Sequence, residues 1–186
     1  MVGIDLSVQL LKIGRKKQGY PPVVFLCCNA HNLPFRNETF DSAVCLGVLH
    51  HLNSDAALLE LRRILKNNGS LVCFEPNLLC PVSFLGRRLY KTHAHTKQER
   101  PFLPRNLIKK FETAGFLIKN VSYLSPIGFA WSWLLAAIYA NRNKQINSQH
   151  KLRNIAKVLR RLDTTLDTKT PFKYLSWTVN ITSVRR

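Results

Sequence analysis

Residues 40–74 read FDSAVCLGVLHHLNSDAALLELRRILKNNGSLVCF, and this stretch decides the fold class. Phe40–Leu46 is an apolar run of strand length, and Ser70–Phe74 is a second one. Between them, Asp55–Lys66 places apolar residues at helical spacing, and Asn67-Asn68-Gly69 is typical of a helix end. The order predicts a strand, a helix and another strand. The apolar positions of the expected helix are Leu58, Leu61, Ile64 and Leu65.

The same alternation occurs closer to the amino terminus. Val2–Leu6 and Val23–Cys27 are short apolar runs, and Ser7 is placed to cap a helix that reaches about Lys17. Continuous apolar strands that alternate with helices favour an α/β fold, with a parallel sheet covered on both faces. The expected helix has a buried side formed by Val8, Leu11 and Ile13.

Polar and small residues follow each expected strand. In parallel sheets, ligands bind beyond the carboxyl ends of the strands. The candidate site is therefore made of Asp5, Cys28-Asn29, Leu46-Gly47-Val48 and Glu75-Pro76-Asn77.

Four segments in this order resemble the class I S-adenosylmethionine-dependent methyltransferases, in particular the type 11-like methyltransferase domain. They are Val2–Ser7, Asn29–Phe35, Phe40–Leu52 and Leu61–Glu75. The resemblance implies a Rossmann-like parallel sheet with helices on both faces and a final antiparallel strand. Further along the chain, a helix over Pro104–Thr113 and strands over Leu117–Leu124 and Phe172–Val184 resemble the later elements of the family.

One domain over residues 1–186 is expected, with a cofactor-side core in 1–80 and an acceptor-side and carboxyl-terminal part in 81–186. Two insertions particular to this chain, 126–140 and 148–166, are the segments in which the family usually encodes acceptor choice.

The chain departs from the family at its start. Members begin with a strand and a glycine-rich loop that approaches the methionine part of the cofactor, and no such motif precedes Val2. In the family the missing strand lies between the strands that here end at Asp5 and Leu46. We therefore expect a truncated sheet with two unpaired edges, unless these two strands pair directly, and weak binding of the cofactor by this chain alone.

The resemblance implies S-adenosyl-L-methionine as cofactor and assigns roles along the strand ends. Asp5 would accept hydrogen bonds from the ribose hydroxyls, although a surface carboxylate is the alternative. Asn29 would accept from the adenine amino group, and Ala30 would offer the adenine a backbone contact. Leu46 and Gly47 would lie beneath the methionine portion of the cofactor.

Four further residues are candidates on the acceptor side. His50 or His51 would remove a proton from the acceptor as a general base, or would simply pack in the protein. Glu75 and Asn77 would line the acceptor pocket. No metal site is expected, because neither His nor Cys occurs at zinc-ligand spacing, and Cys45 and Cys73 are predicted to be core residues.

The positive charge is concentrated in the second half of the chain. The formal net charge is +18, with 8 basic and 6 acidic residues in 1–80 against 20 and 4 in 81–186. Residues 126–140 are apolar and aromatic, and residues 148–162 form a basic amphipathic pattern. Together they predict peripheral contact with an anionic membrane rather than a transmembrane span, while nucleic-acid binding is less favoured because no RNA-binding motif occurs.

The family resemblance, read together with these charge and apolar patterns, implies a methyltransferase that acts on a small or lipid-like acceptor, for which an anionic group is one expectation. The alternatives are a tRNA or rRNA methyltransferase, a protein methyltransferase, and a catalytically silent truncated homologue. The amino terminus lacks the pattern of a signal peptide, so a cytoplasmic location with peripheral membrane contact is expected.

Overall fold

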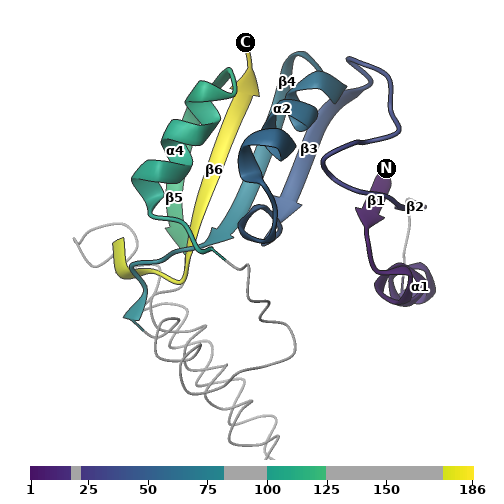
Figure 1. The fold of residues 1–186 in the computed structure, drawn as a ribbon, viewed down its shortest axis with the longest axis horizontal. Coiled ribbons are helices and arrows are strands. Elements are labelled where there is room, and N and C mark those ends of the chain that lie inside the picture. The colour runs from purple at the N-terminus through teal and green to yellow at the C-terminus, as the bar shows by residue number, and fades with distance from the viewer. Residues whose placement is uncertain (18–21, 82–99, 125–173) are drawn as a thin grey trace, which may run out of the picture.

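The computed structural model describes residues 1–17, 22–81, 100–124 and 174–186 (Figure 1). Strands and helices alternate along most of this part of the chain, which confirms the α/β class. The elements in chain order are β1 Val2–Asp5, α1 Val8–Lys17, β2 Val24–Cys27, β3 Phe40–Leu46, the 3-10 helix η1 Leu49–His51, α2 Ser54–Ile64, β4 Leu65–Pro76, α4 Pro104–Thr113, β5 Phe116–Leu124 and β6 Thr178–Arg185.

The larger sheet has four strands in the order β3-β4-β6-β5. β3 and β4 are parallel, whereas β6 runs antiparallel to both of its neighbours, β4 and β5. The predicted final antiparallel strand is thus confirmed and is inserted between β4 and β5. Figure 1 shows α2 and α4 together on one face of this sheet.

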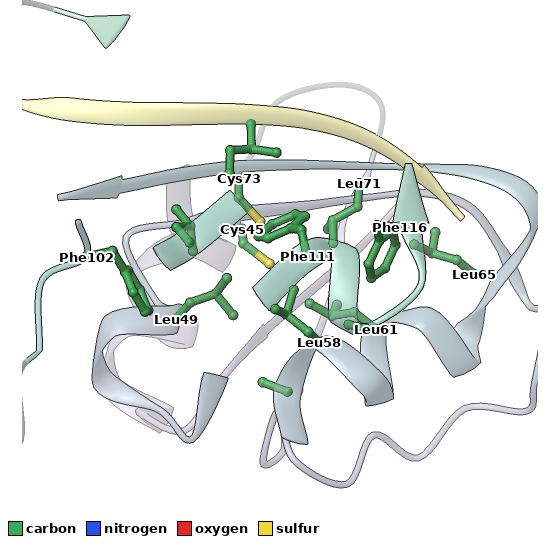
Figure 2. Packing of buried hydrophobic residues seen from close by; sticks show 14 of the residues in the cluster. Cys45, Leu49, Leu58, Leu61, Leu65, Leu71, Cys73, Phe102, Phe111 and Phe116 are labelled. Atoms are coloured by element: carbon green, nitrogen blue, oxygen red, sulfur yellow. The ribbon is translucent and has the colours of Figure 1, made fainter. Parts of the chain in front are cut away.

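The hydrophobic core fills the space between this face and the two helices (Figure 2). Leu58 and Leu61 of α2 and Phe111 of α4 pack toward Leu71 and Cys73 of β4. The four predicted apolar positions of residues 55–66 are all buried, and Cys45 and Cys73 are buried register partners on adjacent strands. The spacing of apolar residues therefore predicted this core correctly.

The opposite face of the sheet differs from the expectation of cover on both sides. Val44 and Leu46 of β3 are 62% and 71% exposed, and in β4 buried residues alternate with half-buried ones. Among the described elements, helices cover only the other face. The exposure follows because Val44 and Leu46 alternate with the buried Cys45 and so point away from the core.

β1 and β2 form a separate two-stranded parallel sheet, with Asp5 in register with Cys27. The prediction that Val8 and Ile13 help form a buried side of α1 is wrong, because both are about half exposed and α1 buries no residue. A sheet of two short strands offers the helix little surface. The helix packs against β2 at Gly14, where an added Cβ would lie 2.9 Å from the Phe25 ring.

Helix α2 ends three residues before the predicted stop. The carbonyls of Arg63 and Ile64 accept from the backbone N–H groups of Glu38 and Thr39 at 3.0 and 2.8 Å, and Leu65 already pairs with β3. The chain thus leaves the helix directly into the sheet. The segment 67–69 lies within the irregular first part of β4, with Asn68 at a φ of 62°.

β1 and β3 are both sheet edges in the described part of the chain, and they do not pair with each other. This arrangement agrees with the expected interruption between the strands that end at Asp5 and Leu46. Both predicted insertions, 126–140 and 148–166, lie outside the described residues, as does the start of the predicted last strand. Within the described residues, no helix is long and apolar enough to cross a membrane.

Candidate functional site

Asp5 ends β1 and is half-buried. Its Oδ1 accepts from the backbone N–H of Ser7 at 2.7 Å, and the Ser7 hydroxyl in turn accepts from the N–H of Leu10 at 3.3 Å. Asp5 and Ser7 together fix the turn into α1. No other described residue contacts the Asp5 carboxylate, so Oδ2 keeps its capacity to accept hydrogen bonds from a ligand.

Asn29 lies just beyond β2 and is tied to His31. Its Oδ1 accepts from the His31 backbone N–H at 3.0 Å and lies 2.9 Å from Nδ1 of the same residue. His31 Nε2 accepts from the backbone N–H of Asn53 at 3.1 Å. Since an amide N–H only donates, the neutral ring carries its proton on Nδ1 and donates it to Asn29. Ala30, the predicted adenine contact, is half-buried between these two residues.

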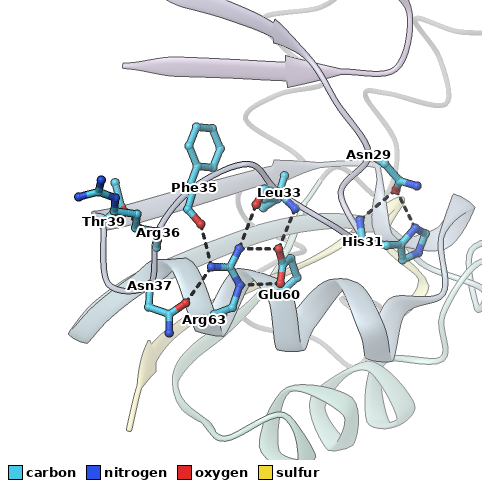
Figure 3. A network of polar contacts seen from close by, with 9 residues as sticks. All are labelled: Asn29, His31, Leu33, Phe35, Arg36, Asn37, Thr39, Glu60 and Arg63. Carbon is cyan, nitrogen blue, oxygen red and sulfur yellow. Dashed lines mark hydrogen bonds and ion pairs between the residues drawn. The ribbon is translucent and has the colours of Figure 1, made fainter.

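The loop that carries Asn29 and His31 is held by an arginine that sequence reasoning missed (Figure 3). The Arg63 guanidinium donates to the carbonyls of Leu33 and Phe35 and to both carboxylate oxygens of Glu60. Glu60 also accepts from the Leu33 N–H at 2.7 Å. The spacing of Glu60 and Arg63 on one helical face was the available signal.

The ion pair between Glu60 and Arg63 also shifts the pKa of both side chains. The hydrogen bond from Arg63 lowers the pKa of the Glu60 carboxyl below its ordinary value, and the same bond raises the pKa of Arg63. Both side chains therefore remain ionised, so the charged clamp on the 29–39 loop persists at neutral pH.

Leu46 ends β3 on the larger sheet, and Gly47 follows it. Gly47 has a φ of +60°, a conformation that favours glycine, and its N–H donates to the Phe74 carbonyl at 2.7 Å. Leu46 is exposed. The strand end thus presents an apolar side chain and a tight turn that leads straight into η1.

Glu75 is completely buried at the end of β4 and organises η1. Oε1 accepts from the N–H groups of Val48 and Leu49 at 3.1 and 2.9 Å. Oε2 accepts from the His50 N–H at 3.3 Å and lies 2.8 Å from His50 Nδ1. One carboxylate thus neutralises the donors at the start of η1 and orients the His50 ring, which is only 6% exposed.

Asn77 is also fully buried and joins β4 to the segment that precedes β6. Its Nδ2 donates to the carbonyls of Tyr174 and Ser176 at 2.8 and 2.9 Å, and its Oδ1 accepts from the Leu79 N–H at 3.0 Å. Like Glu75, Asn77 binds the protein itself. Their predicted contact with an acceptor stays a prediction.

A cavity of about 740 Å³ lies between η1, the start of α2, the segment 100–103 and α4, and we call it the η1–α4 cavity. Of the predicted site residues, only His50 and His51 line it. Their rings lie 3.9 Å apart between centroids. The other lining residues are His31, Leu49, Leu52, Asn53, Ser54, Asp55, Leu78, Arg100, Pro101, Phe102, Leu103, Asn106 and Lys110.

The predicted residues therefore fall into two groups. Asp5, Asn29 and Ala30 belong to the smaller sheet and the loop after it, whereas Leu46, Gly47, His50 and Glu75 belong to the larger sheet and η1. The His31–Asn53 hydrogen bond connects the loop of the first group to the start of α2.

Comparison with known proteins gives a family match and several relatives. Residues 1–73 match the family model described as a methyltransferase domain. An uncharacterized protein of Methanocaldococcus jannaschii is 44% identical over 125 residues, which are 66% of this chain and 49% of that protein. A demethylmenaquinone methyltransferase of Anoxybacillus flavithermus is 30% identical over 119 residues, 62% of this chain and 48% of that protein.

A solved structure of a SAM-dependent methyltransferase from Thermotoga maritima, described as a possible histamine N-methyltransferase, is similar with a TM-score of 0.59. It is 26% identical, and the match covers 67% of this chain and 58% of that one. The chain spans about half the length of the two curated relatives described above.

Proposed function

We propose, from the methyltransferase domain to which residues 1–73 are related, that the protein transfers a methyl group from S-adenosylmethionine to a small or lipid-like acceptor. The match extends from β1 into β4 and includes Asp5 at the end of β1, Asn29 just beyond β2 and Leu46 at the end of β3. The observation that carries the proposal is this family match, together with a half-buried carboxylate that ends a parallel strand.

The residues at these strand ends suit such a cofactor. Asp5 has an oxygen available for ribose hydroxyls, because the Ser7 N–H uses only Oδ1. The turn at Gly47 allows a ligand to approach the backbone, and the exposed Leu46 offers apolar contact. The cofactor supplies an activated methyl group on a sulfonium, so the protein's part is to align the acceptor and exclude water.

A lipid-like acceptor is supported by the relatives and by the cavity. Among the relatives are demethylmenaquinone methyltransferases, and the η1–α4 cavity has apolar side chains such as Leu49, Phe102 and Leu103 in its wall. Contact with an anionic membrane would deliver such an acceptor, and the basic second half of the sequence supports that contact.

The test is titration calorimetry of S-adenosylmethionine with a cofactor-competent version of the chain, extended ahead of Val2 by a strand and glycine-rich loop from a relative. This extended protein is compared with its Asp5→Asn variant. Asparagine keeps an acceptor for the Ser7 N–H but removes the charge that strengthens the ribose bonds. We expect about tenfold to a hundredfold weaker binding, the equivalent of about 1.5–3 kcal/mol.

Asp41→Asn is the matched control, because Asp41 is an exposed carboxylate at the start of β3 that pairs with Lys66. It should leave cofactor affinity unchanged. Equal affinity of the extended protein with and without Asp5→Asn would remove Asp5 from the site, and no binding by the extended protein would favour the silent homologue.

A further inference from the structure

The η1–α4 cavity has a volume typical of small-molecule sites, at about 740 Å³. It lies beyond the carboxyl ends of β3 and β4, where η1, the start of α2 and the chain that enters α4 converge. Its wall combines residues of η1, α2 and α4 with residues of the loops beside them, and Leu49 and Phe102 join it to the packed core.

One part of the wall is apolar. Leu49 and Phe102 are buried in the core, whereas Leu78 and Leu103 remain exposed beside them. Burying exposed apolar side chains against a ligand stabilises the complex. The wall therefore favours a ligand with an apolar body.

Among the described residues that line the cavity, the Arg100 guanidinium is a cation without a carboxylate partner. The Lys110 ammonium contacts both carboxylate oxygens of Asp55 at 2.7 Å, so these two charges compensate each other. Arg100 is exposed, and its backbone N–H is anchored on η1 by donation to the His50 carbonyl at 3.0 Å. No carboxylate among the described residues pairs with the Arg100 guanidinium.

The cavity adjoins the residues expected to hold the cofactor. His31 in its wall is hydrogen-bonded to Asn29, and His50 follows Gly47 by three residues. A ligand in the cavity would thus lie beside the strand ends from which a methyl group would be delivered.

We propose that the η1–α4 cavity binds an amphiphilic anion, with its carboxylate or phosphate on the Arg100 guanidinium and its apolar body against Leu78 and Leu103. A guanidinium forms paired, charge-assisted hydrogen bonds with either group. The inference rests on the proposed function in one respect: it identifies this ligand as the methyl acceptor.

The test measures binding of decanoate, decyl phosphate and decanol to the whole protein by calorimetry, below their aggregation concentrations and without cofactor. We expect both anions to bind about tenfold or more tightly than decanol, because only they pair with Arg100. The stronger of the two anions identifies the group that the site prefers.

Arg100→Gln should weaken the binding of both anions about tenfold and leave the affinity for decanol unchanged. Leu103→Ala should weaken the binding of all three ligands. The matched control is Arg105→Gln, since Arg105 is an exposed arginine of α4 that does not line the cavity. Equal affinities for anions and decanol, or equal losses in the two arginine variants, would overturn the proposal.

A separate titration with S-adenosylmethionine distinguishes the two proposals. Anion binding that depends on Arg100, combined with no cofactor binding even when a strand and glycine-rich loop are added ahead of Val2, would contradict the methyltransferase function and retain the cavity as a ligand site. Cofactor binding without Arg100-dependent anion binding would contradict only the inference made here.

Discussion

At the scale of single residues, Glu75 shows how a polar side chain near the end of a strand can serve the protein's own backbone. Its buried carboxylate accepts from three consecutive N–H groups and from His50. Glu75→Gln places an amide N–H₂ against these donors. We expect the free energy of unfolding to fall by about 2–4 kcal/mol in urea denaturation, because buried donors lose their charged partner.

Glu112→Gln is the control for that measurement, since Glu112 is exposed on α4 and its side chain makes no described contact. It should unfold like the wild type. A loss below about 0.5 kcal/mol in Glu75→Gln would show that the carboxylate does not hold η1 in place.

The Glu60–Arg63 pair predicts a dependence of stability on pH. The Arg63 hydrogen bond lowers the pKa of the Glu60 carboxyl in the folded protein below the value of about 4.5 that it has in the unfolded chain. The ionised carboxylate therefore contributes its full stabilisation at any pH above that unfolded pKa. That stability is lost as the pH falls from there through the folded pKa. In acid titrations followed by circular dichroism, Glu60→Gln should lose less stability than wild type between pH 5 and pH 3. Parallel acid transitions for both proteins would contradict the assignment.

At the scale of elements, the start of α2 depends on one cap. The Asn53 side chain accepts from the Ala56 N–H at 3.3 Å. Asn53→Ala removes this acceptor and should lower the free energy of unfolding by about 1 kcal/mol. Asn53→Asp retains an acceptor and should restore stability, as thermal denaturation of the two variants would show. Equal melting temperatures of the wild type and both variants would mean that the Asn53 cap does not stabilise α2.

Elements with their own apolar period could be predicted from the sequence. The buried stripe of α2 and the strands β3 and β4 follow from the spacing of Leu58, Leu61 and Cys73. The end of α2 could not, because pairing of Leu65 with β3 overrides the local helix-stop signal at Asn67-Asn68-Gly69. The prediction of a buried side on α1 was wrong for a similar reason. Amphipathic spacing specifies which face of a helix is apolar, but it does not specify what packs against that face.

The roles of the candidate site residues stay predictions, and the structure does not bring them to one sheet edge. The rule that ligands bind at strand ends singled out Asp5, Asn29 and Glu75. Asp5 and Asn29 belong to the smaller sheet and the loop after it, however, whereas Glu75 belongs to the larger sheet. The contacts of Glu75 and Asn77 with the backbone, and the place of Arg100 in a cavity wall, depend on tertiary packing. Sequence spacing carries no information about those contacts.

At the scale of the whole molecule, the division into two sheets gives a stability prediction. β1 and β3 each present an unpaired edge among the described strands. Fusing a strand and glycine-rich loop from a close relative ahead of Val2 should pair both edges. We expect a higher melting temperature and tighter S-adenosylmethionine binding in calorimetry, because the added strand satisfies backbone groups and contacts the methionine end of the cofactor.

A fusion with the same composition but a scrambled order serves as control and should bring neither gain. Micromolar cofactor binding and methyl transfer by residues 1–186 alone would contradict the expectation, since the separate sheets would then already form a competent site.

The separation of the two sheets also bears on cooperativity. The helix of the smaller sheet buries no side chain, whereas α2 and α4 enclose a continuous core. Two such units can open with different free energies. They are then connected by the 29–39 loop and by the Glu60–Arg63 clamp that holds it. A ligand that touches Asp5 on one sheet and Gly47 on the other would act as a crosslink, converting two local opening equilibria into one.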